Sequence, residues 1–556
     1  MRRCWIIIII AVLTAAVFTV LMRSPADVRV LPEPVTVESP IVSLQPCPRA
    51  VADTDRAAAV QTIAPPLTDS DADAGPIPDH VTLSPVREFI VAFETSADLQ
   101  VFIDRTGGTG AQVVGTLDMW HMARVRSDFD TLDRLLEGLP VASRQRNYAV
   151  RVPSPQVDVS AGSQSAFGHR ALRWLGVNGD ISMWGNGVTV AVLDTATMGS
   201  QPSSAGTAVT RFDLVDEPVP DASSAFVGHG TAVASLLVGH GEDLQGISPA
   251  IDLLAIAVMD STGGGDVFTV AEGIVLAVDR GADLINMSLG TDFDAAVLRR
   301  AVAYANEHDV LIVASTGNSA ASAVTYPARY ETVMAVSAIG ADGEHAGFAN
   351  TGAAVDIAAP GLGVYAAWTD DAVISFSGTS TAVPFVTGAL AAMISMDERM
   401  TADEARSILL EYADDNGFPG EDEVFGAGVL NVRRIMEREE SGIHDMSIAS
   451  HYLVTSHDDL ETVTIVVSAQ NRGTEPVATA SLAVRVGESE RFYNFRDVAV
   501  GESVSRTLNV DATAANASGD VEIWTKIIEP GSADSRPLDN ELTSILRVTV
   551  PAPAVP

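Results

Sequence analysis

The stretch Val188–Asp194, with the sequence Val-Thr-Val-Ala-Val-Leu-Asp, predicts a buried β-strand that ends in a carboxylate. Further strand candidates follow it, and helical segments lie between them. The expected strands are residues 188–193, 253–258, 284–287, 310–314 and 333–339, and the expected helices are residues 230–239, 266–280 and 294–307. Such alternation predicts an α/β fold in which a parallel sheet is sandwiched by helices.

Four polar side chains are expected at one edge of this sheet. Asp194 ends the first strand, and Asn318 follows another strand in a glycine-containing turn. His229 and Ser380 each begin a helix. Because sites in open α/β folds gather at the carboxyl ends of the strands, we expect these four side chains to lie close together.

The segment Gly378–Pro384 places Ser380 at the start of an apolar helix that runs to Met396, with Pro384 expected in its first turn. The positive end of a helix dipole favours a developing oxyanion. Taken alone, a serine here predicts only an N-cap. An aspartate after a strand is likewise usually a loop or cap residue, and a histidine between glycines is usually structural.

Taken together, Asp194, His229 and Ser380 supply the groups that activate a hydroxyl. The imidazole removes the serine proton, while the carboxylate fixes the imidazole tautomer and stabilises the imidazolium. The side-chain amide of Asn318 can donate to the oxyanion of a tetrahedral intermediate. This set predicts hydrolysis through an acyl-enzyme, without a cofactor for the chemistry.

Over about residues 170–435 the chain resembles the subtilisin-like serine proteases, also called subtilases or peptidase family S8. The segments that carry the resemblance are Asp194-Thr195, His229-Gly230-Thr231, 246–250, 286–290, 316–318, 326–328, 378–380 and 425–432. The resemblance implies a serine-type endopeptidase that acts on protein or peptide substrates. It also implies that Asp194 orients the base, His229 is general base and acid, Ser380 is the nucleophile, and Asn318 lines the oxyanion hole.

Two further segments resemble substrate-binding parts of the family. Ser288, Leu289 and Gly290 resemble the segment that pairs with an extended peptide as an added strand. Ser315, Thr316 and Gly317 resemble a wall of the pocket for the residue before the cut. Both segments are otherwise ordinary loops at strand ends. The neutral side chain next to Asn318 does not favour basic substrates, so we expect a broad apolar preference.

The chain departs from the family pattern at four positions. Ala196, Ala232 and Phe385 replace a glycine and two histidines, none of which carries a proton in the mechanism. Thr381 follows the nucleophile where many relatives have methionine, a side chain that oxidises to a polar sulfoxide. We therefore expect unusual tolerance of peroxide.

Net charge and chain length limit the classes of partner and the number of domains that we expect. The chain has 556 residues, and its 34 basic and 72 acidic residues give a net charge of −38. This charge argues against nucleic acid or an anionic membrane surface as a partner. Oxygen ligands for a structural calcium ion are available on Asp213, Asp216, Glu217 and Asp221, although a solvated acidic surface is the simpler interpretation, and no metal ligand is assigned.

The N-terminus indicates export. Arg2 and Arg3 precede the uncharged apolar residues 5–22, so residues 1–23 are a signal peptide or a membrane anchor. We favour an uncleaved anchor with the bulk of the chain outside the cell membrane, and a periplasmic or secreted enzyme after processing. Residues 24–84 are rich in Pro, Asp, Ala and Val without a helical or strand period, and they predict a disordered linker.

Residues 85–152 show a β/α pattern that resembles an inhibitory propeptide, ahead of a catalytic domain at 153–441. The expected elements are strand 89–93, helix 96–105, one or two strands in 111–125, helix 128–139 and strand 147–152. An unrelated small α/β module is the alternative. A cut between Val152 and His169 would leave the anchor with the propeptide, so maturation would also release the enzyme.

Residues 442–556 predict an antiparallel β-sandwich. Its expected strands are residues 462–468, 481–486, 505–510, 521–528 and 543–550. An appended domain of this kind leaves a second function class open, namely an adhesion or scaffold protein whose protease domain acts only on itself. The complete set of Asp194, His229, Asn318 and Ser380 favours an active endopeptidase, because binding alone needs none of them.

Overall fold

A computed structural model describes much of the chain after residue 87. The described residues are 88–153, 165–197, 208–215, 217, 224–241, 244–369, 372–397, 399–454, 462–487, 489–511, 520–530 and 534–547. The chain divides into units Met1–Pro65 and Pro66–Pro556, and every described element belongs to the second. The expected anchor and linker, residues 1–84, lie outside the described residues, as do Asp216 and Asp221.

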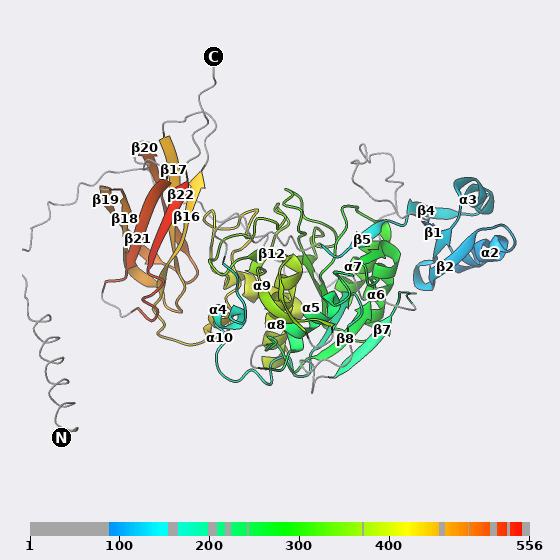
Figure 1. Ribbon diagram of the computed structural model, residues 1–556, viewed down its shortest axis with the longest axis horizontal. Coiled ribbons are helices and arrows are strands. Elements are labelled where there is room, and N and C mark those ends of the chain that lie inside the picture. The colour runs from blue at the N-terminus through cyan, green and yellow to red at the C-terminus, as the bar shows by residue number, and fades with distance from the viewer. Residues whose placement is uncertain are drawn as a thin grey trace, which may run out of the picture. The chain divides into compact units, whose positions relative to one another are not determined.

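A parallel sheet forms the centre of the catalytic region, as the alternation of strands and helices predicts (Figure 1). In the described part of the chain its seven strands lie in the order β13-β12-β11-β10-β6-β8-β7. Their bounds are β6 (Thr189–Asp194), β7 (Val209–Asp213), β8 (Asp252–Ala257), β10 (Leu284–Met287), β11 (Leu311–Ser315), β12 (Val333–Ile339) and β13 (Ile357–Pro360). All neighbouring pairs run parallel, which confirms the α/β fold class.

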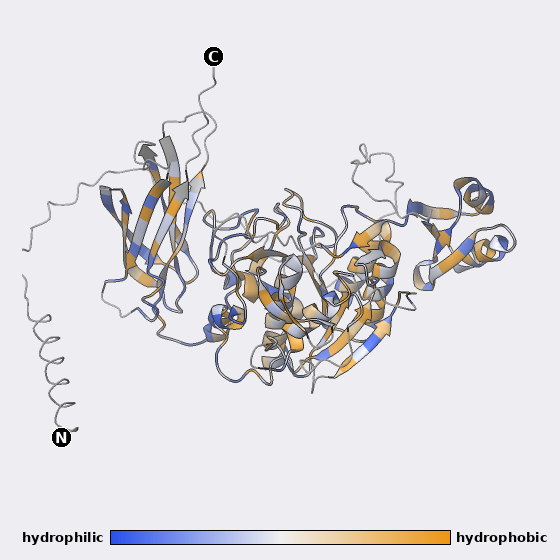
Figure 2. Cartoon of the chain, in the orientation of Figure 1, coloured by the Kyte–Doolittle hydropathy of each residue, from blue (hydrophilic) through white to orange (hydrophobic). Residues whose placement is uncertain are grey.

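Helices cover both faces of this sheet. They are α5 (His229–Val238) and α8 (Thr379–Met396) on one face, and α6 (Val267–Asp279) and α7 (Ala296–Glu307) on the other. Alternate residues of β6 point to opposite faces, since Val190 and Val192 pack with α5 and α8 whereas Ala191 and Leu193 pack with α6 and α7. Burial on both faces explains why the strands read as apolar runs (Figure 2).

Helix α8 begins earlier than the sequence indicates. Its N-cap is Gly378 and Ser380 is the second helical residue, so Ser380 does not have the N-cap position that a serine considered alone would predict. Gly378 has φ 144°, and a Cβ there would lie 2.9 Å from Nδ2 of Asn318. Pro384 falls in the second turn rather than the first. The helix is long and apolar enough to cross a membrane, but 83% of it is buried, as in a core helix.

The region before the catalytic sheet is a small antiparallel sheet with two helices on one face. Its strand order is β2-β3-β1-β4, and its elements are β1 (Glu88–Phe93), α2 (Ser96–Thr106), β2 (Gln112–Leu117), β3 (Met122–Arg126), α3 (Phe129–Leu136) and β4 (Val141–Arg146). Strand β4 was not predicted, because its sequence Val-Ala-Ser-Arg-Gln-Arg carries little apolar signal. The expected strand 147–152 is β5 (Ala149–Arg151), and it pairs with β9 (Gly264–Asp266) of the catalytic region instead.

The C-terminal region is an antiparallel β-sandwich, as predicted. One sheet contains β16 (Met446–Val454), β17 (Thr462–Asn471) and β20 (Ser503–Asp511), and the other contains β18 (Val477–Val486), β19 (Ser489–Val498), β21 (Asp520–Ile528) and β22 (Glu541–Arg547). Apolar side chains from both sheets form one core, and hydrophobic and hydrophilic residues alternate along the strands (Figure 2). Strand β19 was missed because most of its residues are polar and exposed.

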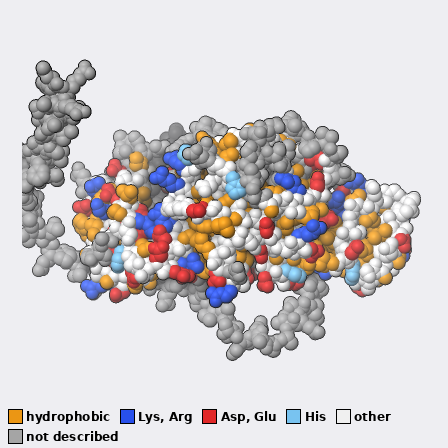
Figure 3. Space-filling model, turned by 90° about the horizontal axis from the view of Figure 1, so that it is seen from below, with side chains coloured by type: hydrophobic (Ala, Val, Ile, Leu, Met, Phe, Trp, Pro, Cys, Tyr) orange, Lys and Arg blue, Asp and Glu red, His pale blue; other side chains and the backbone are white. Residues whose placement is uncertain are grey.

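Smaller elements complete the fold. They are the 3-10 turn η2 (Asp118–Trp120), α4 (Ala171–Trp174), β14 (Val364–Ala367), β15 (Val373–Phe376), α9 (Ala402–Glu411) and α10 (Val432–Glu437). On the face that Figure 3 shows, acidic side chains are interspersed with basic and apolar ones. On this face the negative charge is therefore spread out rather than gathered in one patch.

Candidate active site

Asp194 and His229 form a buried pair at the edge of the sheet. Nδ1 of His229 lies 2.7 Å from Oδ1 of Asp194, and each residue is 1% exposed. An imidazole that carries its proton on Nδ1 donates this hydrogen bond and keeps Nε2 as a proton acceptor. Nε2 is buried and has no hydrogen-bond partner among the described residues. The pair can therefore take up a proton at Nε2.

Glycine allows helix α5 to approach the end of strand β6 this closely. The backbone N–H of Gly230 donates to Oγ1 of Thr195 at 2.9 Å. A Cβ on Gly230 would lie 2.2 Å from the carbonyl oxygen of Thr195, so a larger residue would push the helix away. The segments Asp194-Thr195 and His229-Gly230 thus fix each other, and with them the distance between carboxylate and imidazole.

Ser380 lies at the start of α8 beside the loop that follows β10. Its Oγ donates to the carbonyl oxygen of Ser288 at 3.4 Å, and Oγ of Ser288 donates to the carbonyl oxygen of Ser380 at 3.1 Å. Pro384 has no N–H for the carbonyl of Ser380, which leaves that oxygen free to accept from Ser288. No hydrogen bond joins Ser380 to His229 in the described part of the chain, so the hydroxyl rests against Ser288.

Asn318 is held by the residue that precedes Ser380. Its Oδ1 accepts from the backbone N–H of Thr379 at 2.9 Å and from Oγ1 of Thr379 at 2.8 Å. With Oδ1 occupied in this way, Nδ2 is presented as a donor, and it donates to the carbonyl oxygen of Pro153 at 3.3 Å. The acceptor belongs to the segment that leads out of the small N-terminal region.

That segment lies across the site as an added strand. Arg151 and Gly290 exchange two backbone hydrogen bonds of 3.0 and 2.9 Å, and the N–H of Val152 donates to the carbonyl oxygen of Gly263 at 2.9 Å. Of the three residues expected to bind substrate, Gly290 makes this pairing, Ser288 contacts Ser380, and Leu289 is buried in the core. The chain therefore fills its own cleft at this position.

The second expected substrate segment leads from β11 to Asn318. The hydroxyls of Ser315 and Thr316 are buried and have no hydrogen-bond partner among the described residues. The N–H of Gly317 donates to Oγ1 of Thr379 at 3.3 Å. Sequence reasoning missed Thr195 and Thr379 as orienting residues, although both stand directly beside an expected site residue.

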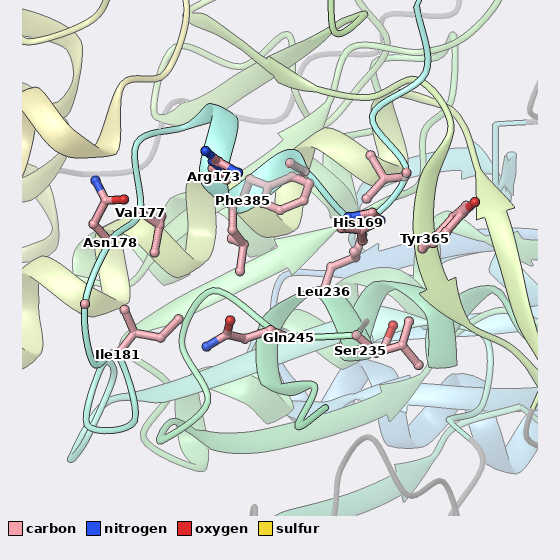
Figure 4. Close-up of a pocket in the computed structure, with 16 residues that line it drawn as sticks. His169, Arg173, Val177, Asn178, Ile181, Ser235, Leu236, Gln245, Tyr365 and Phe385 are labelled. Atoms are coloured by element: carbon pink, nitrogen blue, oxygen red, sulfur yellow. The ribbon is translucent and has the colours of Figure 1, made fainter. Parts of the chain in front are cut away.

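A cavity of about 330 Å³ lies elsewhere in the catalytic region (Figure 4). It is lined by residues such as His169, Arg173, Gln245 and Phe385, and by none of Asp194, His229, Asn318 or Ser380. At the site itself, the chain around Arg151 lies along the edge formed by Gly290 and Gly263.

The acidic loop residues that could hold calcium are engaged within the chain where they are described. Both carboxylate oxygens of Glu217 accept hydrogen bonds from Ser261, and Oδ1 of Asp213 accepts from the N–H of Val215.

Comparison with known proteins agrees with this geometry. The model of the Subtilase family matches residues 185–428, which include Asp194, His229, Asn318 and Ser380. A thermostable alkaline protease of Halalkalibacterium halodurans is 35% identical over 254 residues, covering 45% of this chain and 68% of that protein. Thermitase of Thermoactinomyces vulgaris is 32% identical (41% and 82% covered), and subtilisin Savinase of Lederbergia lenta is 33% identical (44% and 90% covered). The chain therefore belongs to the subtilase family of serine endopeptidases.

Proposed function

We propose that the chain is made as a self-processing zymogen whose catalytic groups are Asp194, His229, Ser380 and Asn318. The observation that carries this proposal is the hydrogen bond from Nδ2 of Asn318 to the carbonyl oxygen of Pro153. A carbonyl that receives this donor, in a segment bound as an added strand, has the environment of the carbonyl that is attacked in a peptide substrate.

The residues divide the reaction between them. Oγ of Ser380 rotates from Ser288 towards His229 and attacks the carbonyl carbon, while Nε2 of His229 accepts the hydroxyl proton. Oδ1 of Asp194 stabilises the imidazolium, and Nδ2 of Asn318 donates to the oxyanion. The imidazolium then protonates the leaving amine, and water hydrolyses the acyl-enzyme by the same route.

The substrate class follows from the segment that occupies the cleft. Backbone pairing with Gly263 and Gly290 recognises any extended peptide, so protein and peptide substrates are bound in the same way. Val150 and Val152 of the resident segment are 1% and 3% exposed. Their burial supports the expected preference for apolar residues on the acyl side of the cut.

In this proposal residues 85–152 are the inhibitory propeptide, 153–441 the catalytic domain and 442–556 an appended sandwich. Because the carbonyl of Pro153 accepts from Asn318, we expect the first cut at the bond after Pro153, so that Pro153 leaves with the propeptide and the boundary moves by one residue. Contacts away from the cleft would keep the propeptide bound afterwards. Arg124 donates to Asp266 at 2.9 Å and to Thr269 at 2.7 Å, and the ring of Trp120 packs against Tyr304.

A serine-directed fluorophosphonate probe on the purified protein tests the nucleophile, with Ser380→Ala as the control. We expect labelling of the parent chain only. Intact mass and N-terminal sequencing test the cut, and we expect a mature enzyme that begins at Ser154 and a Ser380→Ala variant that stays uncut. Absence of labelling would favour the scaffold function. A labelled enzyme with another N-terminus would be consistent with the proposed catalytic groups but would contradict the proposed cut after Pro153.

The proposal also couples maturation to release from the membrane. If residues 1–23 are an uncleaved anchor, the cut leaves the anchor on the propeptide. We expect the catalytic domain in the soluble fraction for the native chain and in the membrane fraction for Ser380→Ala. Equal partition of the two would contradict the coupling.

A further inference from the structure

Three carboxylates meet where the C-terminal sandwich begins. Asp445 directly precedes β16, and Asp534 and Asp539 lie in the segment before β22. One carboxylate oxygen of each residue lies within 4.8 Å of the other two. Asp445 is 0% exposed, and so the cluster reaches into the interior of the protein.

Several oxygens around this cluster have nothing to accept from. Oδ1 of Asp445 and Oδ1 of Asp539 are buried without a hydrogen-bond partner among the described residues, and so is Oδ1 of the neighbouring Asn540. Buried acceptors are costly to leave unsatisfied, and like charges at this separation repel.

The basic side chains nearby are shared with other acids. Arg536 donates to Oδ2 of Asp445 at 2.5 Å, but it also pairs with Glu437 at the end of α10. Arg472 donates to Ser447 and forms an ion pair with Asp414 at 3.3 Å. The negative charge of the three carboxylates is therefore only partly compensated.

The cluster is held in place by the backbone of β16 and by its own loop. Asp534 accepts from the N–H groups of Met446 at 3.2 Å and Arg536 at 2.6 Å. The carbonyl oxygen of Asp539 accepts from the N–H of Ile448 at 2.9 Å and from Oγ of Ser447 at 3.2 Å. These contacts hold the carboxylate of Asp534 and the backbone of Asp539 in place.

We propose that Asp445, Asp534 and Asp539 bind a calcium ion. Calcium takes oxygen ligands in a flexible geometry and completes its shell with carbonyl oxygens and water, and the donor set contains neither the thiolate nor the imidazole that zinc prefers. The ion ties the segment 534–540 to the start of β16. Because Arg536 joins this segment to Glu437, the ion also strengthens the attachment of the sandwich to the catalytic domain.

Equilibrium dialysis against CaCl₂ tests the site in the full chain, in a Ser380→Ala background that stays uncut. We expect Asp539→Asn and Asp534→Asn each to bind one calcium equivalent fewer than the parent. The control Glu522→Gln, which removes one exposed charge from the same domain, should bind as many as the parent. Counting equivalents separates this site from any calcium bound in the catalytic region.

Thermal unfolding gives the second readout. Calcium should raise the midpoint of the transition that includes the sandwich by roughly 5 °C in the parent and in Glu522→Gln, but not in Asp539→Asn. The proposal is overturned if all the variants bind equal amounts of calcium. It is also overturned if magnesium but not calcium raises the midpoint, or if only acidification does so, because the carboxylates would then share a proton instead of a cation.

Discussion

Two buried aspartates, one in the parallel sheet and one at the sandwich, are placed in opposite chemical settings. Oδ1 of Asp194 pairs with the imidazole of His229 and accepts from the backbone N–H of Thr195, each at 2.7 Å, whereas Asp445 faces Arg536 and two further carboxylates. Both side chains are almost fully excluded from solvent. Burial therefore does not determine the role of a carboxylate. Its partners do, and they suit Asp194 to steer a proton and Asp445 to hold a cation.

The largest effect is expected on catalysis near Asp194. Ser380→Ala removes the proposed nucleophile, whose proton the Asp194–His229 pair would accept. Turnover of a peptide substrate should fall about a millionfold, the loss known for subtilisin when its serine is removed. Ser407→Ala, at an exposed serine of α9, is the matched control and should keep full activity. Comparable losses in both variants would point to damage to the fold.

Asn318→Ala tests the proposed oxyanion donor and leaves the Asp194–His229 pair and Ser380 unchanged. The loss of one oxyanion donor should lower kcat by about 10²–10³, as it does in subtilisin, with little change in KM. Asn306→Ala, at an exposed position of α7, is the control. A change confined to KM would instead indicate that Asn318 contributes to substrate binding only. Its hydrogen bond to the carbonyl of Pro153 is also compatible with that role.

The next effect concerns the stability of the sandwich domain as the pH falls. Burial lowers the pKa of His451 to about 4, so the folded state binds its proton less readily than the unfolded state. Its effect on stability is absent above about pH 6.5 and grows as the pH falls towards 4, reaching a loss of about 3 kcal/mol.

Denaturant unfolding of the parent and His451→Gln measures this loss. The parent should lose more stability than the variant between pH 7.5 and 4, because glutamine can keep a bond to Oγ1 of Thr525 but cannot take up a proton. Parallel pH profiles would contradict the assignment to His451.

The smallest expected effect concerns oxidation beside the nucleophile. Thr381 is 0% exposed, and its Oγ1 is buried without a hydrogen-bond partner in the described part of the chain. The parent enzyme should keep its activity in peroxide, and Thr381→Met should lose activity as the sulfoxide forms. Inactivation of the parent as fast as that of Thr381→Met, at the same peroxide dose, would show that oxidation acts elsewhere.

The central sheet could be predicted because its strands are buried on both faces and read as apolar runs. Strand β7 was missed because its residues are largely exposed, and β13 because it is short and ends in Pro360. The order of the candidate site residues predicted that Asp194 meets His229 and that Asn318 lies beside the start of α8, but it did not predict the partner of strand 147–152. A period of two indicates a strand without saying what it pairs with.

The acidic cluster could not be predicted for a related reason. Asp445 and Asp539 lie far apart in the sequence, and only the topology of the sandwich brings their carboxylates together. Nor did the sequence indicate that Gly378, rather than Ser380, caps α8. That outcome depends on the close approach of Asn318, which is a contact between distant segments.

The segment Ser288–Gly290 links the position of Ser380 to the strand that is bound in the cleft. Ser288 holds Ser380 through both its hydroxyl and its carbonyl, and two residues later Gly290 pairs with the chain in the cleft. A peptide that pairs with Gly290 would therefore contact the same short segment that holds Ser380. If Ser380 is the nucleophile as proposed, a weakly bound peptide would leave its hydroxyl less well oriented for attack.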